Sequence, residues 1–191
     1  MMPKKSIRAF WVLAILIAAG SAHAGEEGPF PYDLESGREI AVLGSSAVLF
    51  GLGYWADQSY TPLTPAEIAV LDPATINWFD RAATRQWSPS AAKASDLMLY
   101  ATTVAPLTLI LTDQGRREPG TMGVMYFETY ALQGALTYLA KNLFNRTRPY
   151  VYNDDPDIPL SVKMKNTSRR SFYTGHTTSA FASMIFLASD F

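Results

Sequence analysis

The chain has 191 residues, of which 48% are hydrophobic and 13% aromatic, so one domain with a substantial core is expected. The 16 lysines and arginines nearly balance 17 acidic residues and are spread along the chain, which argues against a basic nucleic-acid-binding surface. Cysteine is absent, which excludes disulfides, thiol nucleophiles and thiolate metal sites.

The first 24 residues have the pattern of a secretory signal peptide. Cations precede an uncharged apolar run over 9–20, and the small residues Ala22 and Ala24 offer a cleavage site. The apolar run is well short of the roughly 20 residues that a spanning helix needs, which disfavours the alternative of an uncleaved anchor. We therefore predict export to the cell envelope.

The remainder is assigned to a leader and one domain. Residues 25–36 are rich in Gly, Glu and Pro, which predicts an extended leader, and 37–191 form the predicted domain. No charge occurs from Ile40 to Ala56, where apolar residues recur at helical spacing, so a helix is predicted there.

Capping residues followed by proline mark further helix starts. They are Thr64-Pro65, where Glu67 completes a capping box, Asp72-Pro73, ahead of Ile76, Phe79 and Ala83, and Ser88-Pro89, which opens a helix to about Thr112. Inside the last of these, Pro106 predicts a kink or a break, because it removes one helical hydrogen bond. No strand alternation is found, so the predicted fold is an all-α helical bundle.

A polar turn is predicted over 113–120, and the longest helix is predicted from Thr121 to about Arg148. The uncharged runs at 40–56 and 97–112 are at or just below the length of a membrane span. Length alone is therefore compatible with helices that cross a bilayer and with buried helices of a soluble bundle.

Lys141 and Arg148 lie seven residues apart, directly before Pro149. On a helix, seven residues turn through about 700°, which would place both cations on nearly one face, roughly 10 Å apart, with room for one anion between them. Proline at 149 disfavours helix at Arg148 and predicts a chain reversal there. The alternative is a helix that ends in a solvated basic turn, which the helix dipole favours.

A second candidate segment leads into the last apolar helix, with Thr174 as the predicted N-cap. The free N–H groups of Gly175 and His176 would point at whatever precedes this helix, which is the geometry of an anion site. His176 could also reach that anion with a proton to donate. The alternative is a histidine that is satisfied within an ordinary helix N-terminus.

Together, Lys-x6-Arg-Pro and a Gly-His helix start resemble the first two signature segments of the type 2 phosphatidic acid phosphatase superfamily. This superfamily also includes bacterial acid phosphatases and vanadium haloperoxidases. Its second segment is usually Pro-Ser-Gly-His, whereas Tyr173 and Thr174 stand in the first two places here. The third segment supplies the attacking histidine, and the sequence ends at Phe191 before it, so we expect a C-terminally incomplete domain that is inactive by itself.

The resemblance implies an all-α bundle of the phosphatidic acid phosphatase and haloperoxidase type. It implies a metal-independent phosphomonoesterase with a phosphohistidine intermediate and no cofactor. Phosphate binding is assigned to Lys141, Arg148, Thr174 and Gly175, and protonation of the leaving alcohol to His176. The substrate class is a lipid phosphate, a pyrophosphate or a small phosphate ester.

Two other functions stay open at this point. One is a haloperoxidase that holds vanadate as its cofactor in the same oxyanion site, and the other is a non-catalytic envelope protein. The hydrophobic helices favour membrane association with a periplasm-facing site over a soluble periplasmic protein. No nucleic-acid partner is expected.

Overall fold

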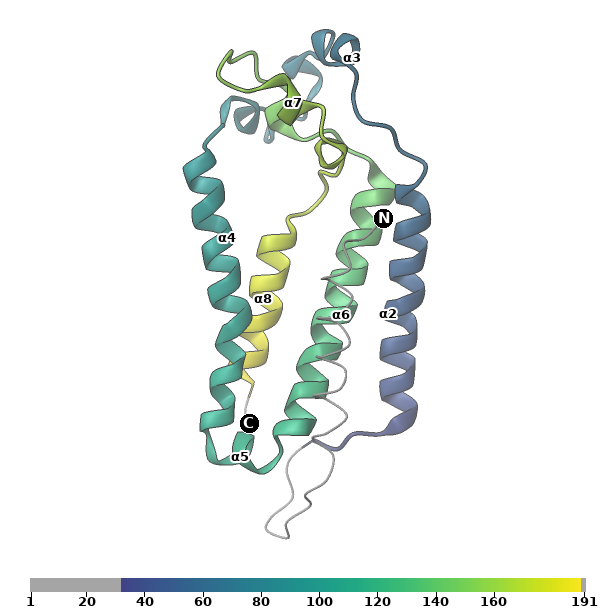
Figure 1. The fold of residues 1–191 in the computed structure, drawn as a ribbon, viewed down its shortest axis with the longest axis vertical. Coiled ribbons are helices and arrows are strands. Elements are labelled where there is room, and N and C mark those ends of the chain that lie inside the picture. The colour runs from purple at the N-terminus through teal and green to yellow at the C-terminus, as the bar shows by residue number, and fades with distance from the viewer. Residues whose placement is uncertain (1–31, 190–191) are drawn as a thin grey trace.

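The computed structural model describes residues 32–189, so the predicted signal peptide lies outside the described residues. Within this range the chain is helical without strands, which confirms the predicted all-α fold. The long helices run along the long axis of the molecule (Figure 1). They are α2 (Ser36–Asp57), α4 (Pro89–Val104), α6 (Pro119–Phe144) and α8 (Gly175–Ala188). Helix α2 packs on α6, and α8 packs on both α4 and α6.

Short helices and turns form a cap at one end of this bundle (Figure 1). They are α3 (Pro65–Ala69), η1 (Pro73–Thr75), η2 (Arg81–Arg85), η4 (Pro149–Tyr152), α7 (Leu160–Lys163) and η5 (Asn166–Arg169). Helix α6 ends and α8 begins on the side of the bundle that faces this cap. The cap therefore covers the end of the bundle that carries both candidate segments.

Two of the predicted helix starts are confirmed in detail. The N–H of Thr64 donates to Glu67 Oε2 at 2.7 Å, and the N–H of Glu67 donates to Thr64 Oγ1 at 3.2 Å, so the capping box is complete. The hydroxyl of Ser88 accepts from the N–H of Ala91 at 3.2 Å, and α4 begins at Pro89.

The prediction of a helix that continues from Asp72 past Ile76 is wrong. The Asp72 side chain accepts from the N–H of Ala74 at 2.7 Å, but the turn that it caps is a 3-10 turn ending at Thr75. Ile76 is buried, but Trp78 and Phe79 remain exposed, so this segment has no continuous apolar face to pack against the rest of the fold. Short helices owe most of their stability to such packing, which explains why the helix does not continue.

At Pro106 the helix changes from α to 3-10 without an interruption of the helical segment. Helix α4 ends at Val104 and continues as the 3-10 segment η3 (Ala105–Leu111), because Pro106 has no N–H to donate. Together they form a helical rod of 23 residues, Pro89–Leu111.

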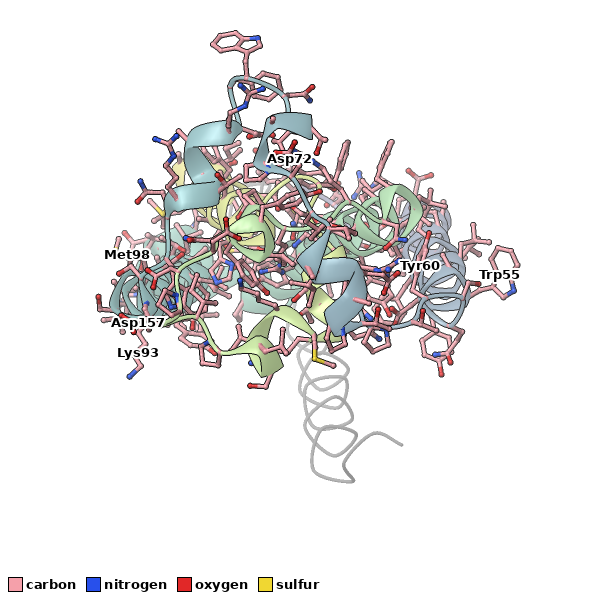
Figure 2. All side chains as sticks on the ribbon, turned by 90° about the horizontal axis from the view of Figure 1, so that it is seen from above. Trp55, Tyr60, Asp72, Lys93, Met98 and Asp157 are labelled. Carbon is pink, nitrogen blue, oxygen red and sulfur yellow. The ribbon has the colours of Figure 1, made fainter. Side chains whose placement is uncertain are left out.

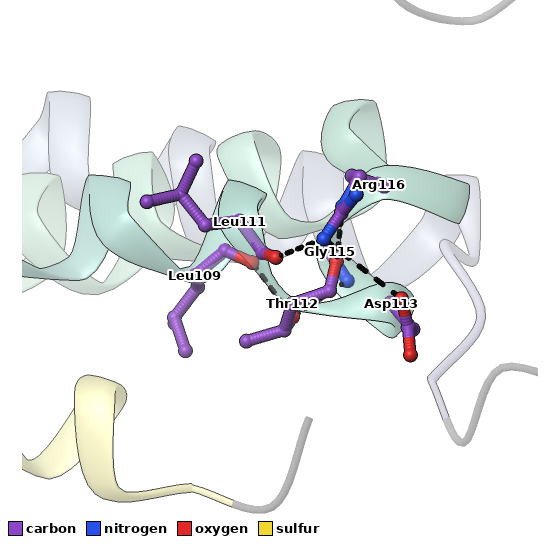
Figure 3. A network of polar contacts seen from close by, with 6 residues as sticks. All are labelled: Leu109, Leu111, Thr112, Asp113, Gly115 and Arg116. Carbon is purple, nitrogen blue, oxygen red and sulfur yellow. Dashed lines mark hydrogen bonds and ion pairs between the residues drawn. The ribbon is translucent and has the colours of Figure 1, made fainter.

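The polar turn predicted over 113–120 contains a short helix in its first part. The hydroxyl of Thr112 accepts from the N–H of Gly115 at 3.0 Å and donates to the Leu109 carbonyl at 2.7 Å, and so caps α5 (Asp113–Arg117) (Figure 3). A Cβ atom at position 115 would overlap the Leu109 carbonyl oxygen, so only glycine fits. This tight turn reverses the chain from η3 into α6.

The longest helix ends at Phe144, earlier than predicted. Asn145 adopts a left-handed conformation with φ 41°, which asparagine tolerates better than most residues and which stops the helix. Lys141 therefore lies in the last turn of α6, while Arg148 has extended backbone angles before Pro149. The prediction that both cations share one helical face is wrong, whereas the predicted non-helical backbone at Arg148 is confirmed.

Helix α2 approaches α6 closely at Gly53. A Cβ atom there would lie 2.8 Å from Tyr138 Cδ1 and 3.1 Å from the backbone of Leu139. Next to this contact, the rings of Phe50 and Tyr138 are stacked with centroids 4.9 Å apart. Because α6 also carries Lys141, this packing sets the position of the helix that bears a site residue.

Gly53→Ala is expected to lower the midpoint of thermal unfolding, because the added methyl group overlaps the α6 backbone; overpacking of this kind costs about 1–3 kcal/mol. Gly51→Ala on the same helix is the matched control, since nothing lies within 4 Å of its Cβ. It should keep or raise the midpoint, because alanine favours helix over glycine. Circular dichroism melts in one detergent measure both variants, and equal midpoints would contradict the close approach.

Candidate active site

The chain just after α6 and the chain just before α8 lie side by side beneath the cap. The N–H of Arg148 donates to the Ser168 carbonyl at 2.8 Å, and the N–H of Ser171 donates to the Arg146 carbonyl at 2.9 Å. These two backbone bonds join the segments that carry the predicted site residues.

Side chains reinforce the same junction. The rings of Phe144 and Phe172 are stacked with centroids 4.0 Å apart, one at the end of α6 and the other ahead of α8. The hydroxyl of Tyr150 lies 2.8 Å from Ser168 Oγ, and Ser168 is fully buried. The two segments are therefore joined by side-chain contacts as well as by backbone hydrogen bonds.

Three arginines of this junction are neutralised by carboxylates from the first half of the chain. The pairs are Arg146 with Asp80 at 2.5 Å, Arg169 with Glu67 at 2.8 Å, and Arg170 with Asp57. Hydrogen bonds from Thr64, first from its backbone N–H, lower the pKa of Glu67 and keep it ionised for Arg169. Asp57 also accepts from the Tyr138 hydroxyl at 3.2 Å. The cap is thus anchored to the junction by charge.

Lys141 and Arg148 have no such partner. Among residues 32–189, neither forms an ion pair with a carboxylate. Lys141 is partly buried, and its Nζ lies 3.1 Å from the position that a Cβ atom on Gly175 would occupy. Arg148 is near enough for its positive charge to act on Lys141. Two like charges held together in this way favour an anion.

Helix α8 begins at Gly175, and Thr174 is the N-cap residue, as predicted. The Thr174 side chain makes no capping hydrogen bond. The first N–H groups of a helix have no acceptor within the helix, so those of α8 are available to a ligand near Gly175, the glycine beside Lys141 Nζ. An anion bound there would accept from backbone donors and lie beside a cation.

His176 contacts a residue that the sequence analysis missed. Its Nε2 lies 2.8 Å from Oδ1 of Asp96 on α4, and 44% of its side chain is exposed. The ring is thus held by another helix rather than by its own N-terminus. A signal for Asp96 was present, because it and Lys93 are the charged residues of the otherwise uncharged α4 sequence.

Polar side chains also join α6 to α8 below the site. Gln133 Nε2 donates to Thr137 Oγ1 at 2.9 Å and to Thr178 Oγ1 at 2.7 Å, and the Ser179 hydroxyl donates to Gln133 Oε1 at 3.3 Å. These bonds fix α8 against the helix that carries Lys141. The predicted site residues of both segments are consequently held on one framework.

The fold thus brings Lys141, Arg148 and the start of α8 together at the capped end of an all-α bundle, as a candidate oxyanion site. The family model of the PAP2 superfamily matches residues 123–190, about a third of the chain. The match is consistent with the resemblance to the type 2 phosphatidic acid phosphatases that the two sequence segments show. The superfamily generally comprises phosphatases, so the match supports a hydrolase that acts on phosphate esters. Comparison with curated proteins and with solved structures gave no match.

Lys141→Gln and Arg148→Gln are each expected to weaken the binding of inorganic phosphate or vanadate by about tenfold or more, because a charge-assisted hydrogen bond is lost. Lys93→Gln is the matched control, since Lys93 on α4 is exposed and lies at the outer edge of the molecule (Figure 2). Isothermal titration gives the affinities. Unchanged affinity in both site variants would remove these residues from the anion site.

Proposed function

We propose that this chain provides the phosphate site and the leaving-group acid of a metal-independent phosphomonoesterase. The observation that carries the proposal is the position of Lys141. Its ammonium group has no carboxylate partner among the residues that the structure describes, and it lies against the glycine that starts α8. A cation and free backbone N–H groups converge there, and a phosphoryl group matches both.

The proposed chemistry follows from where charge resides during phosphoryl transfer. Negative charge is spread over the phosphoryl oxygens, and preorganised cations and N–H donors stabilise it. Lys141, Arg148, Thr174 and the N–H of Gly175 would hold these oxygens. His176 would donate its proton to the alcohol oxygen as the phosphorus–oxygen bond breaks.

The family resemblance supplies the nucleophile, a histidine of the third signature segment. Its ring nitrogen would bond to phosphorus while the alcohol leaves, and water would then release phosphate from the phosphohistidine. In this scheme the residues described above bind the phosphoryl group in both steps. His176 would act as acid in the first step and as base toward water in the second.

A lipid phosphate or pyrophosphate is the substrate class that the exposed apolar helices favour. The helix α2, with 22 residues, and the 23-residue rod Pro89–Leu111 are long and apolar enough to cross a membrane, and both are mostly exposed. Trp55 on α2 and Met98 on α4 point away from the bundle on opposite sides and are 72% and 63% exposed (Figure 2). A core helix of a soluble protein would bury such side chains.

We further propose that the cap end faces the periplasm. The side of the membrane on which the cap lies depends on how many segments of the chain cross the membrane before it. A translocated leader would place the start of α2 outside, and a crossing α2 would then carry the cap inward. A periplasm-facing site therefore requires one of two arrangements. Either α2 lies along the periplasmic surface of the cell membrane without crossing it, or the leader stays in the cytoplasm.

Single cysteines report the topology, because the natural chain has none. Asp157→Cys in the cap and Asp113→Cys in α5 place exposed thiols at opposite ends of the bundle. We expect a membrane-impermeant maleimide to label Asp157→Cys in intact spheroplasts. Labelling at both positions indicates a bundle on the outer surface, and labelling at Asp157→Cys alone indicates crossing helices. Labelling at Asp113→Cys alone contradicts a periplasm-facing site.

His176→Ala tests the function itself, in the protein expressed from the full open reading frame. We expect kcat/KM for an alkyl phosphate to fall at least about a hundredfold, because the alcohol needs a proton to leave. Nitrophenyl phosphate should lose much less, since nitrophenolate leaves without protonation. Equal losses on both substrates contradict the acid role. Vanadate-dependent bromide oxidation in place of hydrolysis would identify a haloperoxidase. If the protein showed neither activity, it would be a non-catalytic binding protein.

A further inference from the structure

We propose that Asp96 is the positioning residue of His176, an inference that rests on the proposed function. Its carboxylate fixes the orientation of the imidazole and determines which ring nitrogen faces the phosphate site. The contact joins α4 to the first turn of α8, with 2.8 Å between Asp96 Oδ1 and His176 Nε2. It reaches across 80 residues of sequence, so the fold and not the local chain creates it.

The surroundings of Asp96 leave it committed to this contact. Within the described part of the chain, His176 is the group with which Asp96 forms an ion pair or hydrogen bond. The other charged residue of α4, Lys93, lies three positions earlier and forms no ion pair with it. Of the two side chains, 58% of Asp96 and 44% of His176 are exposed, so the contact forms without burial of the carboxylate.

Helix α4 is itself held in register with the rest of the bundle, so the carboxylate is a fixed point. The Tyr126 hydroxyl of α6 donates to the Thr103 carbonyl of α4 at 2.8 Å and lies 2.8 Å from Ser183 Oγ of α8. The Tyr130 hydroxyl lies 3.2 Å from Thr103 Oγ1. These bonds tie α4, α6 and α8 together below the site, and Asp96 uses that framework to hold the ring.

The chemistry of imidazole gives this contact its consequence. A neutral ring has one nitrogen that donates and one that accepts, and an ionised carboxylate only accepts. Asp96 therefore takes the hydrogen on Nε2, and Nδ1 is the nitrogen that exchanges a proton with the substrate. When the imidazolium gives its Nδ1 proton to the leaving alcohol, the ring becomes the neutral Nε2–H form, still bonded to Asp96. No further proton transfer is needed.

The first test needs no catalytic activity. The sequence contains two histidines, so a spectrum of ¹⁵N-histidine-labelled protein is assigned with one further variant, His176→Gln. We expect an Nε2–H signal of His176 that exchanges slowly with water. Asp96→Ala should abolish this signal, whereas Asp96→Asn should keep it, because the amide oxygen still accepts. Lys93→Gln on the same helix is the control. A signal that survives Asp96→Ala overturns the proposal.

The second test uses the leaving group, in the protein expressed from the full open reading frame. Asp96→Ala should reduce kcat/KM for an alkyl phosphate by about tenfold or more relative to nitrophenyl phosphate, because proton donation is impaired. In the His176→Ala background, Asp96→Ala should have no further effect on this ratio. If Asp96 had a purely structural role, its replacement would lower kcat/KM for both substrates equally in either background, and that result overturns the inference.

The two tests separate the inference from the function on which it rests. If His176→Ala affects both substrates equally, the acid role fails, and the inference falls with it even where the Nε2–H signal depends on Asp96. If His176→Ala shows the leaving-group effect and Asp96→Ala does not, the proposed function stands and the positioning role is overturned.

Discussion

Positive charge held without a counter-ion at the start of α8 is the constraint on which the rest of the structure depends. Lys141 and Arg148 repel each other, and nothing within residues 32–189 pairs with either of them. Such an arrangement persists only if its surroundings are rigid. The backbone bonds between the two site segments and the stacked Phe144 and Phe172 provide that rigidity. Under the proposed function, a bound anion would relieve this repulsion, and the stability of the junction would then depend on occupancy of the site.

The carboxylates near the site are arranged so that they do not neutralise these two cations. Asp57, Glu67 and Asp80 each pair with an arginine of the junction. All three lie before residue 123, outside the segment matched by the superfamily model. The first half of the chain therefore contributes to the site without containing a signature residue. Its carboxylates hold the signature segments in place through these ion pairs, and they are therefore not paired with Lys141 or Arg148.

Local signals in the sequence predicted the features that depend on neighbouring residues. The capping box at Thr64 and the start of α4 at Pro89 were readable, because hydrogen bonds within one turn create them. The N-cap position of Thr174 was also predicted, although its side chain makes no capping hydrogen bond. The left-handed Asn145 and the arrest of the helix after Asp72 were not, since backbone strain and missing tertiary packing decide them. The pairing of Asp96 with His176 depends on how α4 and α8 pack, which no local pattern encodes.

The glycine at position 175 shows why two distant signature segments form one physical requirement. Its backbone is helical, so glycine is not needed there for a left-handed conformation. The constraint is space: a Cβ atom would lie 3.1 Å from Lys141 Nζ and 3.6 Å from the methyl carbon of Thr137. A methyl group would fill the place where an oxyanion meets both the ammonium group and the helix N–H groups, and would push the flexible lysine away. Lysine on α6 and glycine on α8 therefore form one spatial requirement, because any side chain at position 175 would press on the ammonium group of Lys141.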